Sequence, residues 1–151
     1  MRLHRNLCFS VIDGLTLIFN EGNYADKVIQ QLLKRDKRWG SRDRAFVAET
    51  TYDIVRWKRL YAEIAEVKEP FDRDKIWRIF AVWAVLRGYT LPDWKYFEET
   101  PVRRIKGKFD ELTKTRKFKE PSKSHYFFVL IVNHFSKSCI TFRFVLTNCL
   151  L

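Results

Sequence analysis

Apolar residues recur at three- and four-residue steps through much of the chain between Leu3 and Leu112. This spacing predicts α-helices, because it places the apolar side chains on one helical face. Leu3, Leu7, Val11, Leu15 and Ile18 follow it and predict a first helix over residues 3–20. Further helices are predicted over residues 23–34, 41–66, 72–87 and 100–112, and "TLPDW" at residues 90–94 starts a short one. The stretch "IWRIFAVWAVL" is apolar on nearly every side, which predicts that the fourth helix is central and buried.

No strand pattern occurs before residue 120, so the predicted fold is an all-α bundle of helices joined by short loops. Asp72 is positioned to cap the fourth helix, and Gly88 to end it. Ser41 is the predicted N-cap of the long helix over residues 41–66.

The chain changes character after residue 119. From Pro121 onward it contains no Asp or Glu, and the stretches "HYFFVLIVNHF" and "CITFRFVL" favour strands. The predicted organisation is a helical domain over residues 1–119 and an atypical, irregular or β-prone tail over residues 120–151. One hypothesis is a truncated product with a disordered or frame-shifted end, which the adjacent genomic reading frames would test. The alternative is a short β-hairpin or a tail that touches a membrane.

The charge balance favours a polyanionic partner. The chain has 29 Lys and Arg against 18 Asp and Glu, a formal net charge of +11. Such a balance is typical of proteins that bind RNA, DNA or an anionic membrane surface. The apolar runs are too short to span a bilayer, so no membrane span is expected. The alternative is a basic protein whose charge serves only solubility.

The cations concentrate in the stretch "KRDKRWGSRDRAFVAETTYDIVRWKRL", which covers residues 34–60. In a helical frame its apolar residues face the core and its cations project outward, where arginine offers a planar fork of donors to phosphate. Trp39 beside the predicted turn either stacks on an unpaired base or packs on a neighbouring helix, and packing is favoured. The predicted RNA-binding residues are Arg2, Arg5, Arg35, Lys37, Arg38, Arg42 and Arg44.

Cysteine and histidine spacing predicts no metal site. Cys8, Cys139 and Cys149 form no CxxC pair, and no histidine lies at a metal-ligand spacing from them. An odd number of cysteines without a disulfide framework favours a reducing compartment, and the expected location is the cytoplasm. Cys8 falls on the first predicted helix and is expected to be a core or half-buried residue.

The segment "LLKRDKRWGSRDRAFVAETTYDIVRWKRLYAEI" resembles the NusB-like all-helical domain at the N-terminus of RsmB/Sun-type ribosomal RNA cytosine-C5 methyltransferases. The resemblance rests on the helix "DRAFVAETTYDIVRWKRL" and on the basic run before it. The fourth helix, "IWRIFAVWAVLRGY", is also similar to the core helix of that family. The resemblance covers about residues 1–119.

The resemblance implies a helical bundle that binds RNA, ribosomal RNA in particular. In the methyltransferases this module precedes a domain that binds S-adenosylmethionine and attacks cytosine with a cysteine, usually one that follows proline. This chain has five dispersed glycines and no cysteine after a proline, so we expect no catalytic residue and no cofactor here. The leading interpretation is the non-catalytic RNA-binding module of such an enzyme. The alternatives are a NusB-like antitermination factor with a ribosomal-protein partner, or a helical protein–protein adaptor.

Overall fold

The computed structural model describes residues 3–115, and these residues form an all-α bundle, which confirms the predicted fold class. The described part contains six α-helices and one 3-10 helix. They are α1 (Arg5–Asn20), α2 (Ala25–Arg35), α3 (Ser41–Arg56), α4 (Lys58–Ala65), α5 (Arg73–Leu86), η1 (Lys95–Phe97) and α6 (Val102–Lys114). The tail predicted over residues 120–151 lies outside the described residues.

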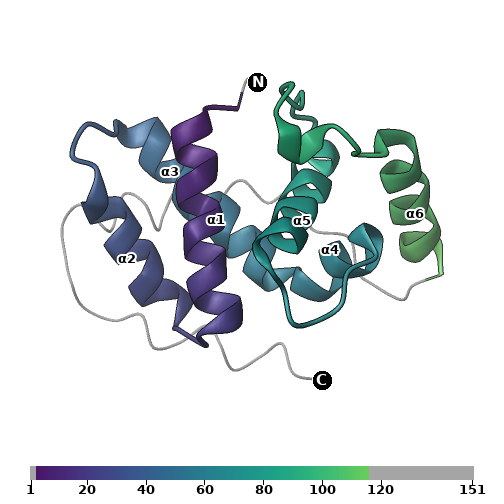
Figure 1. Ribbon diagram of the computed structural model, residues 1–151, viewed down its shortest axis with the longest axis horizontal. Coiled ribbons are helices and arrows are strands. Elements are labelled where there is room, and N and C mark those ends of the chain that lie inside the picture. Colours follow the sequence, from purple (N-terminus) through teal and green to yellow (C-terminus); the bar gives the residue numbers. More distant parts are fainter. Residues whose placement is uncertain (1–2, 116–151) are drawn as a thin grey trace. The chain divides into compact units, whose positions relative to one another are not determined.

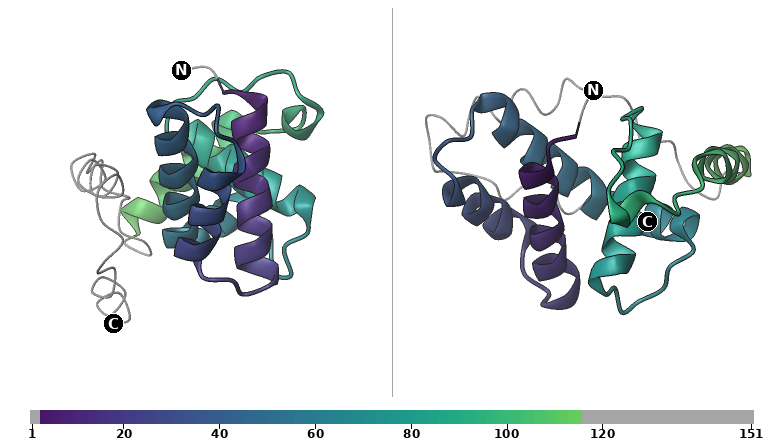
Figure 2. Two further views of the ribbon diagram at one scale, coloured as in Figure 1. Left: turned by 90° about the vertical axis from the view of Figure 1, so that its left-hand side faces the viewer. Right: turned by 45° about the horizontal axis from the view of Figure 1, so that its top comes forward.

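The helices form two groups of three. Helices α1, α2 and α3 contact one another, and α4, α5 and α6 make a second mutually contacting set (Figure 1). Contacts of α5 with α1 and with α3 join the two groups. In the right-hand view of Figure 2, α6 lies at the edge of its group, away from α1 and α2.

Helix α5 is the buried centre of the bundle, as the sequence predicted. Nine of its fourteen residues are buried, among them Trp77, which stacks on Tyr96 at a ring distance of 4.4 Å. The Asp72 side chain caps α5 by accepting a 2.8 Å hydrogen bond from the Lys75 backbone N–H, as expected. Gly88 ends the helix with a φ of +77°, in the left-handed region that favours glycine.

The single long helix predicted over residues 41–66 is wrong, because the chain breaks at Trp57. Its φ of −107° and ψ of 22° end α3 and start α4. Helix α3 packs against α1 and α2, whereas α4 packs against α5 and α6, so one straight helix would not serve both groups. The short helix predicted to start within residues 90–94 is present only as the 3-10 helix η1, which begins at Lys95.

One cap prediction differs from the structure in detail. Ser41 is the first residue of α3, and Gly40 occupies the cap position before it. The Gly40 N–H donates to the Asp43 carboxylate at 3.1 Å, so an acidic side chain of the first turn caps the N-terminus of the helix.

Among residues 3–115, no helix is both long enough and apolar enough to cross a bilayer.

Candidate nucleic-acid interface

Three of the predicted RNA-binding residues converge on one open groove, with a volume of about 550 Å³. The groove runs along the N-terminal half of α1, beside the end of α2 and the turn that follows it. We call it the α1 groove. Its lining residues are Arg5, Asn6, Phe9, Ser10, Asp13, Arg35, Asp36, Arg38 and Trp39. The fold therefore brings together cations that the sequence places on two separate helices and a turn.

The turn after α2 is fixed by an arginine and a carboxylate two residues apart. Asp36 accepts hydrogen bonds from the backbone N–H of Arg38 at 2.9 Å and from its guanidinium at 3.0 and 2.9 Å. These bonds lower the pKa of the Asp36 carboxyl from 3.8 to about 2 and raise the pKa of Arg38. The Arg38 side chain nevertheless stays 86% exposed, so its free donors face solvent. The ion pair orients this guanidinium without covering it.

Arg44 stabilises the turn through hydrogen bonds to the backbone. Its guanidinium donates to the backbone oxygen of Leu33 at 2.9 Å and to that of Trp39 at 3.2 Å. It therefore satisfies a carbonyl in the last turn of α2, which no backbone N–H of that helix can reach. Arg44 is half-buried and committed to these two carbonyls. Its observed contacts hold the turn in place.

Trp39 packs on the core and also lines the α1 groove. Its side chain is half-buried and packs against the hydrophobic core, in agreement with the favoured packing interpretation. It also lines the α1 groove next to Arg38. An aromatic wall beside guanidinium groups is the combination on which unpaired bases stack in single-strand binding proteins.

Arg35 does not project alone into solvent. Its guanidinium pairs with the Asp13 carboxylate of α1 at 3.0 Å, and Arg73, the first residue of α5, pairs with the other oxygen at 2.9 Å. The sequence did not identify either Asp13 or Arg73 as part of the site. Arg5, Phe9 and Asp13 recur at steps of four, so a helical projection could have placed Asp13 on the face of Arg5. No pattern in the sequence could have brought Arg73 there.

Two arginines lie close to the ring of Phe9, which also lines the groove. The guanidinium carbon of Arg5 lies 5.4 Å from the ring centre, and that of Arg73 lies 6.0 Å away. Both distances fall within the range of a cation–π interaction. Phe9 therefore helps to place two cations beside α1.

The other predicted residues lie outside the α1 groove. Lys37 and Arg42 are exposed, and neither forms an ion pair with another residue in the described part of the chain. Lys37 belongs to the turn after α2, and Arg42 to the first turn of α3. Arg2 falls outside the described residues.

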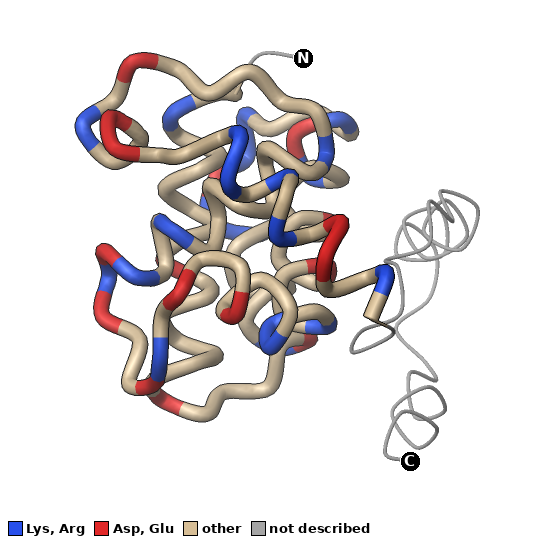
Figure 3. The backbone as a smooth tube through the Cα atoms, turned by 90° about the vertical axis from the view of Figure 1, so that its right-hand side faces the viewer, with Lys and Arg blue, Asp and Glu red and all other residues tan. Residues whose placement is uncertain are grey.

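The side of the bundle that carries α4 and α6 has a mixed charge pattern. Both basic and acidic positions occur on that side (Figure 3). Arg104 and Lys108 of α6 both pair with Glu66, whose pKa they lower. Helix α6 is nevertheless basic on balance, with five cations against Asp110 and Glu111, but none of its cations lines the α1 groove.

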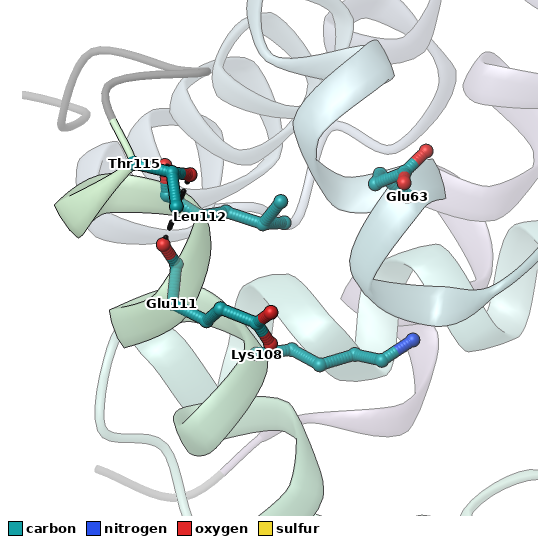
Figure 4. A pocket seen from close by; sticks show the side chains of 5 residues that line it. All are labelled: Glu63, Lys108, Glu111, Leu112 and Thr115. Carbon is teal, nitrogen blue, oxygen red and sulfur yellow. Dashed lines mark hydrogen bonds between the residues drawn. The ribbon is translucent and has the colours of Figure 1, made fainter.

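A second hollow, of about 680 Å³, lies between α4 and α6 (Figure 4). Two of its lining side chains are carboxylates, and its lysine, Lys108, is already paired with Glu66. This lining does not suit a polyanion. The residues that line it are Glu63, Lys108, Glu111, Leu112 and Thr115.

Cys8, the one cysteine among residues 3–115, lies in the core. Cys8 is fully buried, and burial raises the pKa of its thiol to about 12, so the thiolate that would act as nucleophile is scarce at neutral pH. In the same part of the chain, no three His, Cys, Asp or Glu side chains come together as metal ligands would. Cys8 is a core residue, as the sequence predicted.

Comparisons with known proteins yielded no match, whether with models of protein families, with curated proteins or with solved structures. The resemblance to the NusB-like domain therefore stays a prediction that rests on the sequence alone.

Proposed function

We propose that the protein binds RNA through the α1 groove and the exposed cations beside it. The observation that carries this proposal is the convergence of Arg5, Arg35 and Arg38 on one open groove that Trp39 also lines. Phosphate contacts supply most of the affinity of proteins for nucleic acids, and arginine donors suit them. Lys37 and Arg42 extend the basic surface along the turn after α2 and the start of α3.

The biological context we propose follows the resemblance to the NusB-like domain. In this context the chain is a non-catalytic module for ribosomal RNA modification, and the chemistry belongs to a methyltransferase domain that binds S-adenosylmethionine. A NusB-like antitermination factor would use the same RNA-binding surface together with a ribosomal protein. Copurification of a small ribosomal protein would favour that second context.

A protein–protein adaptor is the competing function, and specific contacts favour it. The pairs Arg35–Asp13 and Arg38–Asp36 each place a carboxylate against a predicted RNA-binding cation. If these pairs persist in solution, they reduce the positive field of the groove. An adaptor would then carry its charge for solubility alone.

The salt dependence of RNA affinity separates the two functions. We expect the affinity for a fluorescein-labelled oligouridine of about 12 nucleotides to fall steeply with salt. For each phosphate contacted, the logarithm of the binding constant should fall by about 0.7 for every tenfold rise in salt concentration. An affinity that barely changes between about 50 and 200 mM salt would contradict RNA binding and favour the adaptor.

A multiple substitution then locates the binding surface. Replacing Arg35, Lys37, Arg38 and Arg42 by alanine should weaken RNA binding at an almost unchanged melting temperature, because all four side chains are exposed. Arg44 is left in place because it holds the turn.

A matched control removes four exposed cations elsewhere. Its members are Arg78, Arg103, Lys106 and Lys114. Equal losses of affinity in the two variants would show that only net charge matters and would overturn the assignment to the α1 groove. Unfolding of the first variant would mean that its four residues are structural.

A further inference from the structure

Two arginines from different helices share one carboxylate in the α1 groove. Arg35 at the end of α2 binds one oxygen of Asp13 at 3.0 Å, and Arg73 at the start of α5 binds the other at 2.9 Å. Two positive charges thus meet one negative charge, and the cluster keeps a net charge of +1. The two guanidinium groups are held at a separation set by a single two-oxygen anion.

All three side chains are open to solvent. Arg35 is 63% exposed, Arg73 is 48% exposed and Asp13 is 32% exposed. Ion pairs this exposed contribute little to stability, because water and salt screen them. The arginines can therefore exchange one anionic partner for another without disturbing the core.

A phosphodiester group matches the acceptor that Asp13 now provides. Its two non-bridging oxygens, like those of a carboxylate, can each accept from one guanidinium fork. Arginine is the residue best suited to such a change of partner, because it keeps its charge at all relevant pH values.

The position of Arg73 is not explained by the stability of its own helix. It is the first residue of α5, where the helix dipole disfavours a positive charge. The neighbouring Asp72 carboxylate is occupied by the Lys75 backbone N–H, while the Arg73 guanidinium turns toward Phe9 and Asp13. Its charge is therefore directed to the groove that Arg5 and Arg35 line.

We infer that, on RNA binding, a phosphate group takes the place of the Asp13 carboxylate between Arg35 and Arg73. Asp13 is then an internal competitor of the RNA, and Arg73 is a further RNA-binding residue. This inference rests on the proposed function. It predicts the sign of one change in affinity: removing the Asp13 carboxylate from this groove strengthens RNA binding.

The test compares Asp13→Asn with the unchanged protein, using fluorescence anisotropy of the same labelled oligouridine. One additional phosphate contact should raise the affinity about fivefold at roughly 0.1 M salt. It should also steepen the slope of the logarithm of the binding constant against the logarithm of the salt concentration by about 0.7. Asp110→Asn is the matched control, since it removes one exposed carboxylate from α6. It should have a much smaller effect.

Arg73→Gln provides an independent measurement should Asp13→Asn fail to fold. It should weaken binding about fivefold under the same conditions, and the double variant should lose the gain of Asp13→Asn. The inference is overturned if Asp13→Asn binds no more tightly than Asp110→Asn, or if Arg73→Gln leaves the affinity unchanged. The proposed function fails separately, if Arg5→Gln and Arg38→Gln also leave the affinity unchanged.

Discussion

The indole N–H of Trp83 in α5 donates a 2.7 Å hydrogen bond to the carboxylate of Asp53 in α3. The same oxygen accepts from the Arg87 guanidinium at 3.0 and 2.6 Å and from the Tyr61 hydroxyl of α4 at 3.2 Å. Burial, reinforced by the Asp53 charge, raises the pKa of the Tyr61 hydroxyl. One carboxylate therefore ties three helices together across the break at Trp57.

We expect Asp53→Ala to lower the free energy of unfolding by about 2–4 kcal/mol, because it leaves the donors of Trp83 and Tyr61 without an acceptor. Asp53→Asn should cost less, since its amide oxygen still accepts while the attraction to Arg87 is lost. Urea denaturation measures both. Asp110→Ala, at an exposed position of α6, should stay within about 0.5 kcal/mol of the unchanged protein. A similar loss in both alanine variants would contradict the structural role of Asp53.

Two glycines inside helices should respond to the same substitution with opposite signs. A Cβ at Gly14 of α1 would lie 2.6 Å from a methyl carbon of Leu32 in α2, and Leu32 is itself buried. Gly14→Ala should therefore destabilise the protein by about 1–2 kcal/mol, because overpacking outweighs the gain in helix propensity. A Cβ at Gly107 of α6 would meet nothing within 4 Å, so Gly107→Ala should stabilise by about 0.5–1 kcal/mol.

Thermal or urea unfolding of the two glycine variants decides the point. If Gly14→Ala is as stable as Gly107→Ala, α1 and α2 do not approach each other as closely as the structure places them.

The fold was predictable where the sequence expresses local rules. The apolar periodicity identified α1, α2 and α5, and Asp72 and Gly88 marked the two ends of α5. The break at Trp57 was not predictable, because the apolar stripe continues through it at helical spacing. What ends α3 is the packing of its continuation on a different pair of helices, and that information is tertiary.

The candidate site was predictable only in part. The density of cations between residues 35 and 44 identified Arg35 and Arg38, and the structure places both on the α1 groove. Sequence could not separate the exposed Arg38 from Arg44, whose donors turn inward to two backbone carbonyls. Contacts across 22 and 60 residues bring Arg35 and Arg73 to Asp13, and no local pattern encodes them.

The Asp36 carboxyl should titrate well below the ordinary range. Arg38 lowers its pKa to about 2, so the folded protein keeps this ion pair down to roughly that pH. Because the folded pKa is depressed, the contribution of the pair to stability is complete above the ordinary value of 3.8 and fades as the pH falls toward 2.

Carbon-detected NMR of the side-chain carboxyl between about pH 2 and 5 measures this titration. Arg38→Ala should move the midpoint upward, toward 3.8, because the hydrogen bonds from the guanidinium are gone. A midpoint already near 3.8 with Arg38 present would show that the pair does not persist in solution. That result would also remove the main objection to Arg38 as a phosphate ligand.

Trp39 provides the sharpest test of whether the α1 groove accepts an unpaired base. Trp39→Leu keeps an apolar side chain against the core but removes the aromatic surface, whereas Trp39→Phe keeps an aromatic ring. If a base stacks there, Trp39→Leu should weaken binding of the labelled oligouridine about tenfold, and Trp39→Phe should retain most of the affinity.

The matched control is Trp57→Leu, which makes the same chemical change at a half-buried tryptophan that does not line the groove. It should leave the RNA affinity almost unchanged. Far-UV circular dichroism shows whether each variant is folded at the temperature of the binding measurement. Equal affinities of Trp39→Leu and Trp39→Phe would limit Trp39 to packing, and the RNA would then bind through its phosphates alone. A duplex oligonucleotide should in that case bind as well as a single strand, because phosphate contacts do not require an exposed base.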